Sequence, residues 1–241
     1  MRSEFSQSRA LRAKLLEAMT VGEYSQCEHL PPESELSEKL GISRTQLRDI
    51  LAGLDREGYI TRRHGVGTII NRHVLEAKNR VDIEVEFLDM IRRSGFTPGT
   101  AYVVPTEEAA SEAIAHQLNI AVGAPVVRIA RLCTANGKPA IYCEDVFPKA
   151  LLRVPYTKED LLLPVFHILQ DICEVFPYMD LTDVRAAAAD EKLAGIFGVP
   201  VGAPLLNMEE VDYDIDGKPV FVSSEYFADG IFHHTVMRKK F

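Results

Sequence analysis

The chain has 241 residues, 46% of them hydrophobic, and a formal net charge of −8, so it can form one large domain or two ordinary ones. Residues 1–72 contain 11 Lys and Arg against 10 Asp and Glu, whereas the remaining residues contain 16 against 25. This acidic balance excludes a protein that coats DNA over its whole surface, and leaves a local basic surface as the place for phosphate contacts. Because no apolar run reaches 18 residues and the N-terminus lacks a signal-peptide pattern, we expect a cytoplasmic protein without a membrane partner.

The N-terminal segment predicts two helices. Residues 5–20 have apolar side chains at helical spacing and predict an amphipathic helix that packs behind the next elements. A second helix begins near Glu33, because Leu36 and Leu40 are four residues apart and share one face. Gly41 follows at once, where the C-terminus of a helix favours a residue with positive φ.

A third helix starts after a recognisable cap. Ser43 is the predicted N-cap, and Gln46 three residues later completes a capping box. The side chains that face away from the apolar stripe include Arg44, Thr45 and Arg48. In helix-turn-helix modules the outer side chains near the start of the second helix reach base edges in the major groove. The apolar stripe itself consists of Leu47, Ile50, Leu51 and Leu54.

The next segment predicts a β-hairpin with a glycine-rich tip. Two β-rich segments, residues 59–61 and 68–70, flank the run Arg62–Gly67. The glycines Gly65 and Gly67 let the backbone approach a phosphate strand closely. The order of helix, turn, capped helix and hairpin predicts a winged helix-turn-helix that binds DNA, although scattered arginines alone are equally typical of a solvated helical hairpin.

Residues 30–68 resemble the DNA-binding domain of the GntR family of bacterial transcription regulators. Pro32 and Ser34 depart from the family pattern, and the family usually has a DNA-contacting Arg where Ser34 stands. The matching positions are Leu30, Pro31, Glu33, Leu36, Gly41, Ser43, Arg44, Arg48, Gly58, Arg63, Gly65, Gly67 and Thr68. The DNA-contacting residues that we expect are Pro31, Ser34, Ser43, Arg44, Thr45, Gln46, Arg48, Arg63, His64, Gly65, Gly67 and Thr68.

The rest of the chain contains an internal repeat. Gly123–Val127 (GAPVV) recurs as Gly202–Leu206 (GAPLL), and residues 136–139 (NGKP) recur as residues 216–219 (DGKP). Each copy has a helix before it, then two β-rich runs joined by an Asn-Gly or Asp-Gly turn. We therefore expect an α+β protein, whose second domain pairs two helix-plus-hairpin units into one antiparallel sheet with a crevice between them. The predicted boundaries are residues 1–72 for the winged helix-turn-helix, 73–80 for a linker and 81–241 for the second domain.

The second domain resembles the UTRA effector-binding domain of the HutC branch of the GntR family. The resemblance implies a homodimer on a pseudo-palindromic operator, and a small-molecule effector such as a phosphorylated sugar or related metabolite that relieves repression. Two departures, Cys133 in place of an Arg and Cys143 in place of a Glu, imply that the effector differs from a typical amino-sugar phosphate. The implied effector residues are Thr97, Thr100, Arg131, Cys133, Cys143, Glu144, Ser223 and Tyr226.

Structural roles without a ligand stay open for several of these residues. Arg131 is equally suited to pair with a neighbouring carboxylate, and Glu144 and Asp145 are typical of a solvated strand face. The cysteines are widely spaced, so we expect no metal site and no cofactor, and reduced thiols are the default. The sequence has no nucleophile–base pair or nucleotide loop, which argues against an enzyme. A regulator that responds to a protein partner or to thiol oxidation is the remaining alternative.

Overall fold

The computed structural model describes residues 2–240, except for the side chains of residues 2–7 and 9. The chain forms two compact units: residues 1–83 together with 234–241, and residues 84–233. This division differs from the expected linear order, because the last eight residues group with the first unit. No helix within the described residues is both long and apolar enough to cross a membrane.

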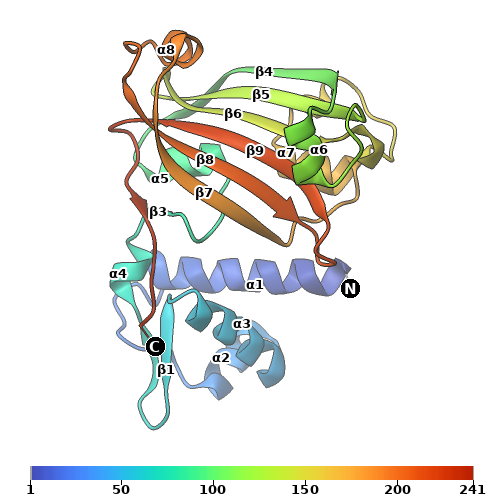
Figure 1. The fold of residues 1–241 in the computed structure, drawn as a ribbon. Helices are drawn as coiled ribbons and strands as arrows, with labels where there is room; N and C mark the ends of the chain where they lie inside the picture. The colour runs from blue at the N-terminus through green and yellow to red at the C-terminus, as the bar shows by residue number, and fades with distance from the viewer. Residues whose placement is uncertain (1, 241) are drawn as a thin grey trace. The chain divides into compact units, whose positions relative to one another are not determined.

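The core of the first unit consists of three helices and a hairpin (Figure 1). They are α1 (Arg2–Thr20), α2 (Glu33–Leu40), α3 (Arg44–Arg56), and the strands β1 (Ile60–Arg63) and β2 (Gly67–Ile70). Gly41 closes α2 with φ of 65°, as predicted from its place after Leu40. The helices bury one apolar cluster, whose members include Leu15, Met19, Leu36, Leu47, Leu51, Leu54 and Ile60.

The segment predicted as a linker is part of this unit. It contains the helix α4 (Arg72–Leu75) and the strand β3 (Asn79–Arg80). The Arg72 guanidinium donates to the backbone oxygens of Met19, Tyr24 and Cys27, which ties α4 to the end of α1. These long-range contacts explain why a polar stretch with no apolar period is nevertheless ordered here.

The C-terminal segment completes the unit. The strand β10 (His234–Thr235) pairs in parallel with β3, and the Val81 N–H donates to the Thr235 oxygen over 2.8 Å. Met237 packs against Gly58, where an added Cβ would lie only 2.9 Å from the methionine methyl carbon. The first unit is therefore assembled from both ends of the chain.

The second unit contains one antiparallel sheet in the order β4-β5-β6-β9-β8-β7. Each half of the sheet is a strand, a helix and a hairpin, with α6 (Glu112–Leu118) following β4 and α8 (Glu191–Phe197) following β7. The helix α5 (Phe87–Arg93) comes before β4. The strands are β4 (Pro98–Ala109), β5 (Pro125–Ala135), β6 (Lys138–Pro148), β7 (Met179–Ala188), β8 (Pro204–Tyr213) and β9 (Pro219–Ala228).

Local signals produce these elements. Asn136 and Gly137 form the two-residue turn between β5 and β6 with φ of 51° and 79°, the conformation that a tight hairpin requires. The side chains of Ser111 and Asp190 accept hydrogen bonds from the backbone of α6 and α8 and cap both helices. The predicted hairpins are thus present, each extended by a strand that precedes its helix.

The two faces of the sheet are covered differently. On one face, which we call the helix face, α6 and α8 bury two apolar clusters toward opposite ends of the strands (Figure 1). On the other, the segment of residues 149–175 covers Phe147, Phe221 and their neighbours. This segment contains short helical turns, η1 (Lys149–Leu151), η2 (Asp160–Leu162), α7 (Val165–His167) and η3 (Ile168–Ile172). We call this second side the acidic face, because of the carboxylates that its central strands place there.

Candidate nucleic-acid interface and effector site

The capped helix α3 forms the centre of the candidate nucleic-acid interface. The Ser43 hydroxyl accepts from the Gln46 N–H, and the Gln46 side-chain oxygen accepts from the Ser43 N–H, both over 3.2 Å. The predicted capping box is therefore confirmed. Leu47, Leu51 and Leu54 are buried, and the opposite side of α3, with Thr45 and Arg48, is exposed to solvent.

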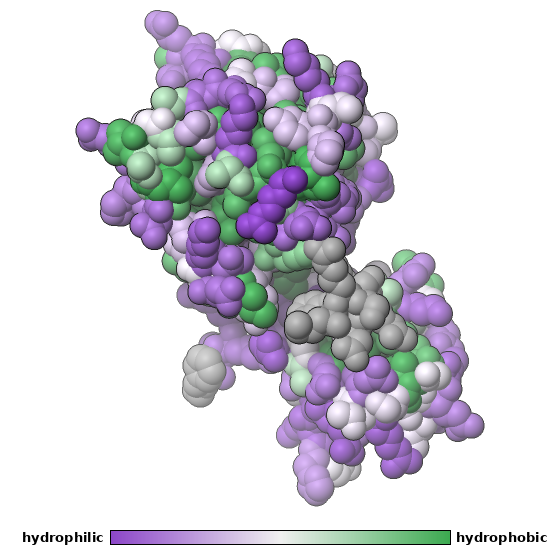
Figure 2. Space-filling model, turned by 90° about the vertical axis from the view of Figure 1, so that its right-hand side faces the viewer, coloured by the Kyte–Doolittle hydropathy of each residue, from purple (hydrophilic) through white to green (hydrophobic). Residues whose placement is uncertain are grey.

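The predicted DNA-contacting residues lie on three neighbouring parts of the first unit. Ser34 near the start of α2 is exposed, as are the four residues Ser43 to Gln46 and Arg48 at the start of α3. The hairpin tip exposes Arg63, His64, Gly65 and Gly67, while Pro31 and Thr68 are half-buried. In the view of Figure 2 the surface of this unit is mostly hydrophilic. No ion pair links Arg44 to any side chain that the structure describes, so its guanidinium is available to a ligand.

Glu33 connects the second helix, the third helix and the hairpin. Its carboxylate accepts from the Arg48 Nε and from the Arg62 Nη2, each over 2.7 Å. The hydrogen bond from Arg48 and the charges of both arginines lower the pKa of Glu33. Arg48 is still 62% exposed. Arg62 was not among the predicted contacts, and the 15-residue separation of Glu33 and Arg48 offers no sequence signal for the bridge.

The structure divides the predicted effector residues between the two faces of the sheet. Neighbouring residues of a strand point to opposite faces, so Cys143 and Glu144 cannot share a site. By strand register, Arg131, Cys143 and Ser223 lie on the acidic face, as does Cys133. Glu144 and Tyr226 lie on the helix face.

Arg131 is occupied by backbone oxygens of the covering segment. Its guanidinium donates to the Leu163 oxygen over 2.6 Å and to the Leu162 oxygen over 3.3 Å. The expected alternative of a carboxylate ion pair is therefore not what this buried side chain forms. The backbone oxygens of Leu162 and Leu163 instead hold the guanidinium of Arg131 on the acidic face.

Burial disfavours the thiolate form of both cysteines on this face. Burial raises the pKa of Cys133 to about 11 and raises the pKa of Cys143 well above its usual value. The Cys143 Sγ lies 3.9 Å from the Asp145 carboxylate, which accepts from the Ser223 hydroxyl over 2.9 Å. The open alternative of a solvated strand face does not apply to Asp145, which is only 2% exposed. Asp145 lies on the acidic face with Cys143, whereas Glu144 lies on the helix face.

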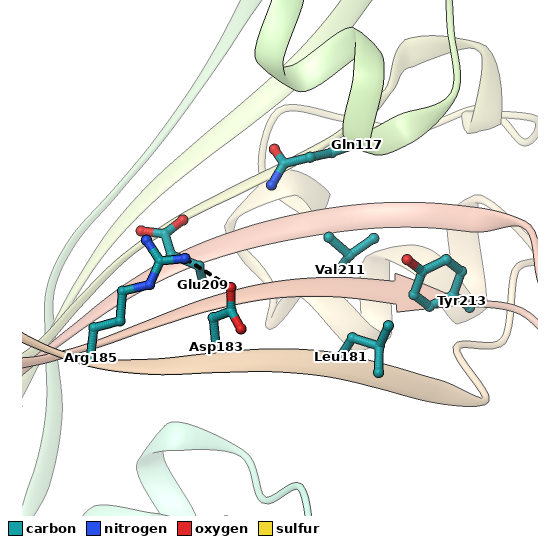
Figure 3. A pocket seen from close by; sticks show the side chains of 7 residues that line it. All are labelled: Gln117, Leu181, Asp183, Arg185, Glu209, Val211 and Tyr213. Atoms are coloured by element: carbon teal, nitrogen blue, oxygen red, sulfur yellow. Dashed lines mark hydrogen bonds and ion pairs between the residues drawn. The ribbon is translucent and has the colours of Figure 1, made fainter.

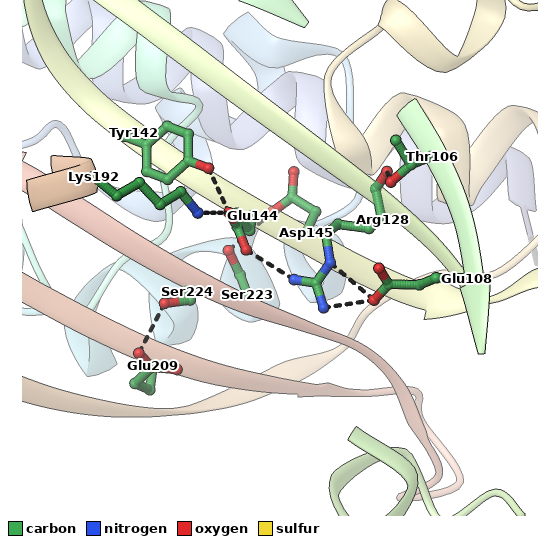
Figure 4. Close-up of polar contacts among 10 residues, drawn as sticks. All are labelled: Thr106, Glu108, Arg128, Tyr142, Glu144, Asp145, Lys192, Glu209, Ser223 and Ser224. Atoms are coloured by element: carbon green, nitrogen blue, oxygen red, sulfur yellow. Dashed lines mark hydrogen bonds and ion pairs between the residues drawn. The ribbon is translucent and has the colours of Figure 1, made fainter. Parts of the chain in front are cut away.

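Glu144 belongs to a polar network on the helix face (Figure 4). It accepts from Arg128 over 2.9 Å, from Lys192 over 2.5 Å and from the Tyr142 hydroxyl. Burial opposes its ionisation, but the bonds from Lys192 and Tyr142 prevail and lower the pKa of Glu144. Arg128 also pairs with Glu108 over 2.7 Å. This carboxylate is thus compensated within the protein.

The segment with Thr97 and Thr100, two of the implied effector residues, is tied to a neighbouring turn. The Thr97 N–H donates to the Asn136 side-chain oxygen over 2.7 Å, which joins the start of β4 to the β5–β6 turn. Thr100 lies within β4, and both threonine residues are exposed. The structure does not bring either of them into hydrogen-bonding contact with Arg131.

A pocket of about 370 Å³ opens on the helix face between α6 and the strands β7 and β8 (Figure 3). Arg185 and Asp183 form an ion pair of 2.8 Å on its floor. None of the predicted effector residues lines this pocket. The lining residues are Gln117, Leu181, Asp183, Arg185, Glu209, Val211 and Tyr213.

Comparison with known proteins assigns both units. Residues 7–70 match the family described as bacterial regulatory proteins, gntR family, and residues 93–232 match the UTRA domain. An uncharacterised HTH-type transcriptional regulator of Rhizobium meliloti is 26% identical over 88% of this chain and 86% of its own length. An HTH-type transcriptional regulator of Mycobacterium tuberculosis is 25% identical over 88% and 76%.

Solved structures share the fold. A protein described as a possible transcriptional regulator, YydK of Bacillus subtilis, superposes with a TM-score of 0.75 at 18% identity, covering 96% of this chain and 99% of its own. PhnF of Mycobacterium smegmatis superposes with a TM-score of 0.60 at 21% identity, covering 96% and 98%. At these identities the likeness concerns the fold alone.

Proposed function

The chain belongs to the UTRA-domain transcription regulators that carry a gntR-family DNA-binding domain, and we propose that it is a repressor whose operator affinity falls when a metabolite binds its UTRA unit. DNA binding is the role of the first unit and small-molecule binding the role of the second. The relatives are transcription regulators and not enzymes. The sign of the response and the nature of the metabolite are the proposed part.

The observation that carries the proposal is the exposed start of α3. The capping box fixes this end, the buried leucine stripe orients it, and the arginines Arg44 and Arg48 project to solvent. Such a helix start fits the major groove, while the hairpin tip with Arg63 and His64 fits the phosphate backbone or the neighbouring minor groove. The remaining proposed contacts are Pro31, Ser34, Ser43, Thr45, Gln46, Gly65, Gly67 and Thr68.

The proposed mechanism is a shift of population in a homodimer. Two copies of α3 must match two operator half-sites one helical turn apart. An effector that binds more tightly to a dimer with mismatched spacing favours that state and lowers operator affinity. A coupling free energy of about 1–3 kcal/mol changes the affinity by roughly 5- to 150-fold. A phosphorylated sugar or related metabolite is the effector class that the family resemblance implies.

An operator mobility-shift titration tests the proposal. The probe is the duplex that the protein selects from its own promoter region or from a random library, with and without a metabolite panel and reductant. Arg44→Ala should weaken binding by about 1–3 kcal/mol and relax sequence preference. Lys78→Ala is the matched control, since it removes one exposed positive charge outside α3 and the hairpin.

Several results would count against the proposal. If no metabolite alters operator affinity, or if reductant alone does, the UTRA unit does not act as the proposed sensor. If Arg44→Ala and Lys78→Ala lose affinity equally at every sequence, α3 does not read bases. A metabolite that tightens operator binding would reverse the proposed sign while leaving the sensor in place.

A further inference from the structure

Five carboxylates from four neighbouring strands share the acidic face. Register pairs Asp145 of β6 with Ser223 of β9, and Ser223 with Glu210 of β8. Glu225 lies two residues from Ser223 on β9 and therefore points to the same face. Asp212 lies two residues from Glu210 and pairs across the sheet with Asp180 of β7. Because adjacent strands are about 4.8 Å apart, these side chains form one acidic cluster across the four strands.

Three of these carboxylates are deeply buried, and none of them forms an ion pair with a described side chain. Asp145 is 2% exposed, Asp212 1% and Glu225 7%. Burial raises the pKa of Asp212 to about 9 and that of Asp145 to about 6, and the neighbouring carboxylates add to the effect at Asp212. The basic side chain beside this cluster is Arg131 of β5, and its guanidinium donates two hydrogen bonds to backbone oxygens of the covering segment.

Asp212 is the member whose hydrogen bonding is incomplete. The Asp145 carboxylate accepts from Ser223, and Glu210 accepts from Thr182 over 3.2 Å. The Asp212 Oδ2 is buried and accepts no hydrogen bond from the residues that the structure describes. Burying such an acceptor unpaired costs free energy, and an N–H donor of a bound ligand would remove that cost.

The chemistry of this face selects the class of ligand. An anion would be repelled by the surrounding carboxylates. Among the described side chains, no group of three or more His, Cys, Asp or Glu is arranged to hold a metal ion. An ammonium or guanidinium group provides several N–H donors and a positive charge, and both complement clustered carboxylates. Met208 and Phe221 are buried beside Glu225 and Asp212 in the register, and they offer apolar contact to a carbon chain.

We propose that the acidic face binds a small organic cation, an aliphatic primary amine or guanidine, through Asp212, Glu225 and Asp145, and that this cation is the effector of the UTRA unit. The inference rests on the proposed function, because it names the ligand class to which the repressor responds. It departs from the phosphorylated sugar implied by the family resemblance, since Arg131 beside these carboxylates donates to the covering segment and the central strands of this face carry carboxylates instead of cations.

Calorimetric titration of the full-length protein at pH 8 tests the inference. The probes are 1,4-diaminobutane and agmatine, with 1,4-butanediol as the uncharged analogue, glucose 6-phosphate as the anionic one, and sodium chloride at matched ionic strength. The two amines should bind and the other two probes should not. Asp212→Asn and Glu225→Gln should each weaken amine binding by about 10- to 100-fold, the range expected for a hydrogen bond to a charged group.

Asp183→Asn is the matched control. Asp183 lies on β7, faces the pocket of the helix face and is well exposed, so this variant should bind amines as the parent does. Asp212→Asn should also melt at a higher temperature than the parent without ligand, because folding of the parent at pH 8 requires this buried carboxyl group to take up a proton. That gain separates loss of binding from loss of folding.

The outcomes distinguish the inference from the proposed function. Glucose 6-phosphate binding without amine binding overturns the inference and leaves a metabolite-responsive repressor standing. Amine binding that fails to change operator affinity supports the ligand class and contradicts the proposed coupling. Amine binding that is lost in Asp183→Asn, but kept in Asp212→Asn and Glu225→Gln, places the cation on the opposite face and overturns the inference.

Discussion

At the scale of single residues, Glu33 decides how many positive charges the DNA-binding surface offers. Its carboxylate accepts from Arg48 on α3 and from Arg62 on the hairpin. These charge-assisted hydrogen bonds position both guanidinium groups. The carboxylate also lowers the net positive charge of the DNA-binding surface by one. Glu33 therefore fixes the positions of the Arg48 and Arg62 side chains and weakens the general attraction of this surface to phosphate.

Glu33→Gln should free Arg48 and Arg62 and remove that negative charge. Binding to random duplex should tighten, and the slope of log K against log salt should steepen by about 1 to 2, roughly one unit for each new phosphate contact. The ratio of specific to non-specific affinity should fall. Fluorescence anisotropy over a salt series measures both quantities.

Glu35→Gln is the control for this prediction, because Glu35 is exposed on the same helix and forms no ion pair with the described side chains. Equal slopes for Glu33→Gln and Glu35→Gln would show that the bridge does not restrain the arginines.

At the scale of elements, the capping box determines where α3 begins. Ser43→Ala removes the acceptor for the Gln46 N–H and should lower the free energy of unfolding of the first unit by about 0.5–2 kcal/mol. Urea unfolding followed by circular dichroism measures the change. Thr45→Ala, on the exposed side of the same helix turn, should leave the midpoint nearly unchanged; a comparable loss there would mean that the cap contributes little.

The central strands of the sheet make the stability of the second unit depend on pH. In the unfolded chain Asp212 loses its proton near pH 3.8, whereas in the folded protein its pKa is about 9. The folded state therefore binds more protons over this interval, and stability should fall as pH rises from 6 to 9. Glu210, with a pKa raised to about 7, acts in the same direction. The charged groups that act on Asp212 are Glu84, Glu210, Asp180 and Asp145, and Glu225 lies on the same face of the neighbouring strand β9.

Thermal melting of the second unit at pH 6, 7.5 and 9 tests this dependence. The parent should melt highest at pH 6, and Asp212→Asn should flatten the change between pH 7.5 and 9. Asp183→Asn should melt with the parent's profile. A parent melting temperature that rises toward pH 9 would contradict the direction of the shift.

The elements that the sequence predicts correctly are those whose conformation is determined by residues close together in the chain. Ser43 with Gln46, and Asn136 with Gly137, each report a local conformation that needs no distant partner. The strands β4 and β7 were not predicted, because both are edge strands with mainly exposed side chains and no clear alternation. Such strands are ordered by their neighbours rather than by their own pattern.

The candidate effector site was harder to predict, because a site on a sheet depends on which side each residue faces. Arg131, Cys143 and Ser223 were expected together and do share a face. Glu144 was grouped with them although alternation alone separates it from Cys143. Asp212 and Glu225 were missed, since their proximity to Asp145 follows from the pairing of β6 with β9 and of β9 with β8, which joins residues far apart in the chain.

At the scale of the whole molecule, the chain passes between its two units twice, at residues 83–84 and at residues 233–234. The returning segment forms β10, and the Met237 N–H donates to the Asp82 carboxylate over 3.3 Å. Lys239 donates to the Asp55 oxygen of α3. The end of the chain is thus part of the structure that carries the recognition helix.

Deleting residues 234–241 should destabilise the first unit by an amount on the order of 1–3 kcal/mol, the sum expected for a few backbone and charged hydrogen bonds. The melting transition of the second unit should stay in place. Differential scanning calorimetry resolves the two transitions. Deleting only residues 240 and 241 keeps β10 and should preserve both; if the longer deletion also preserves both, the returning segment adds no stability.

Because two segments of the chain connect the units, a single proteolytic cut cannot separate them. A protease that cuts once between residues 83 and 84 leaves the two units covalently joined through residues 233 and 234, so the nicked protein still contains both in one linked assembly. Release of a free DNA-binding piece requires a second cut, and that piece then consists of two peptides held together by β3 and β10. A recombinant fragment that stops at residue 83 lacks one of them from the start.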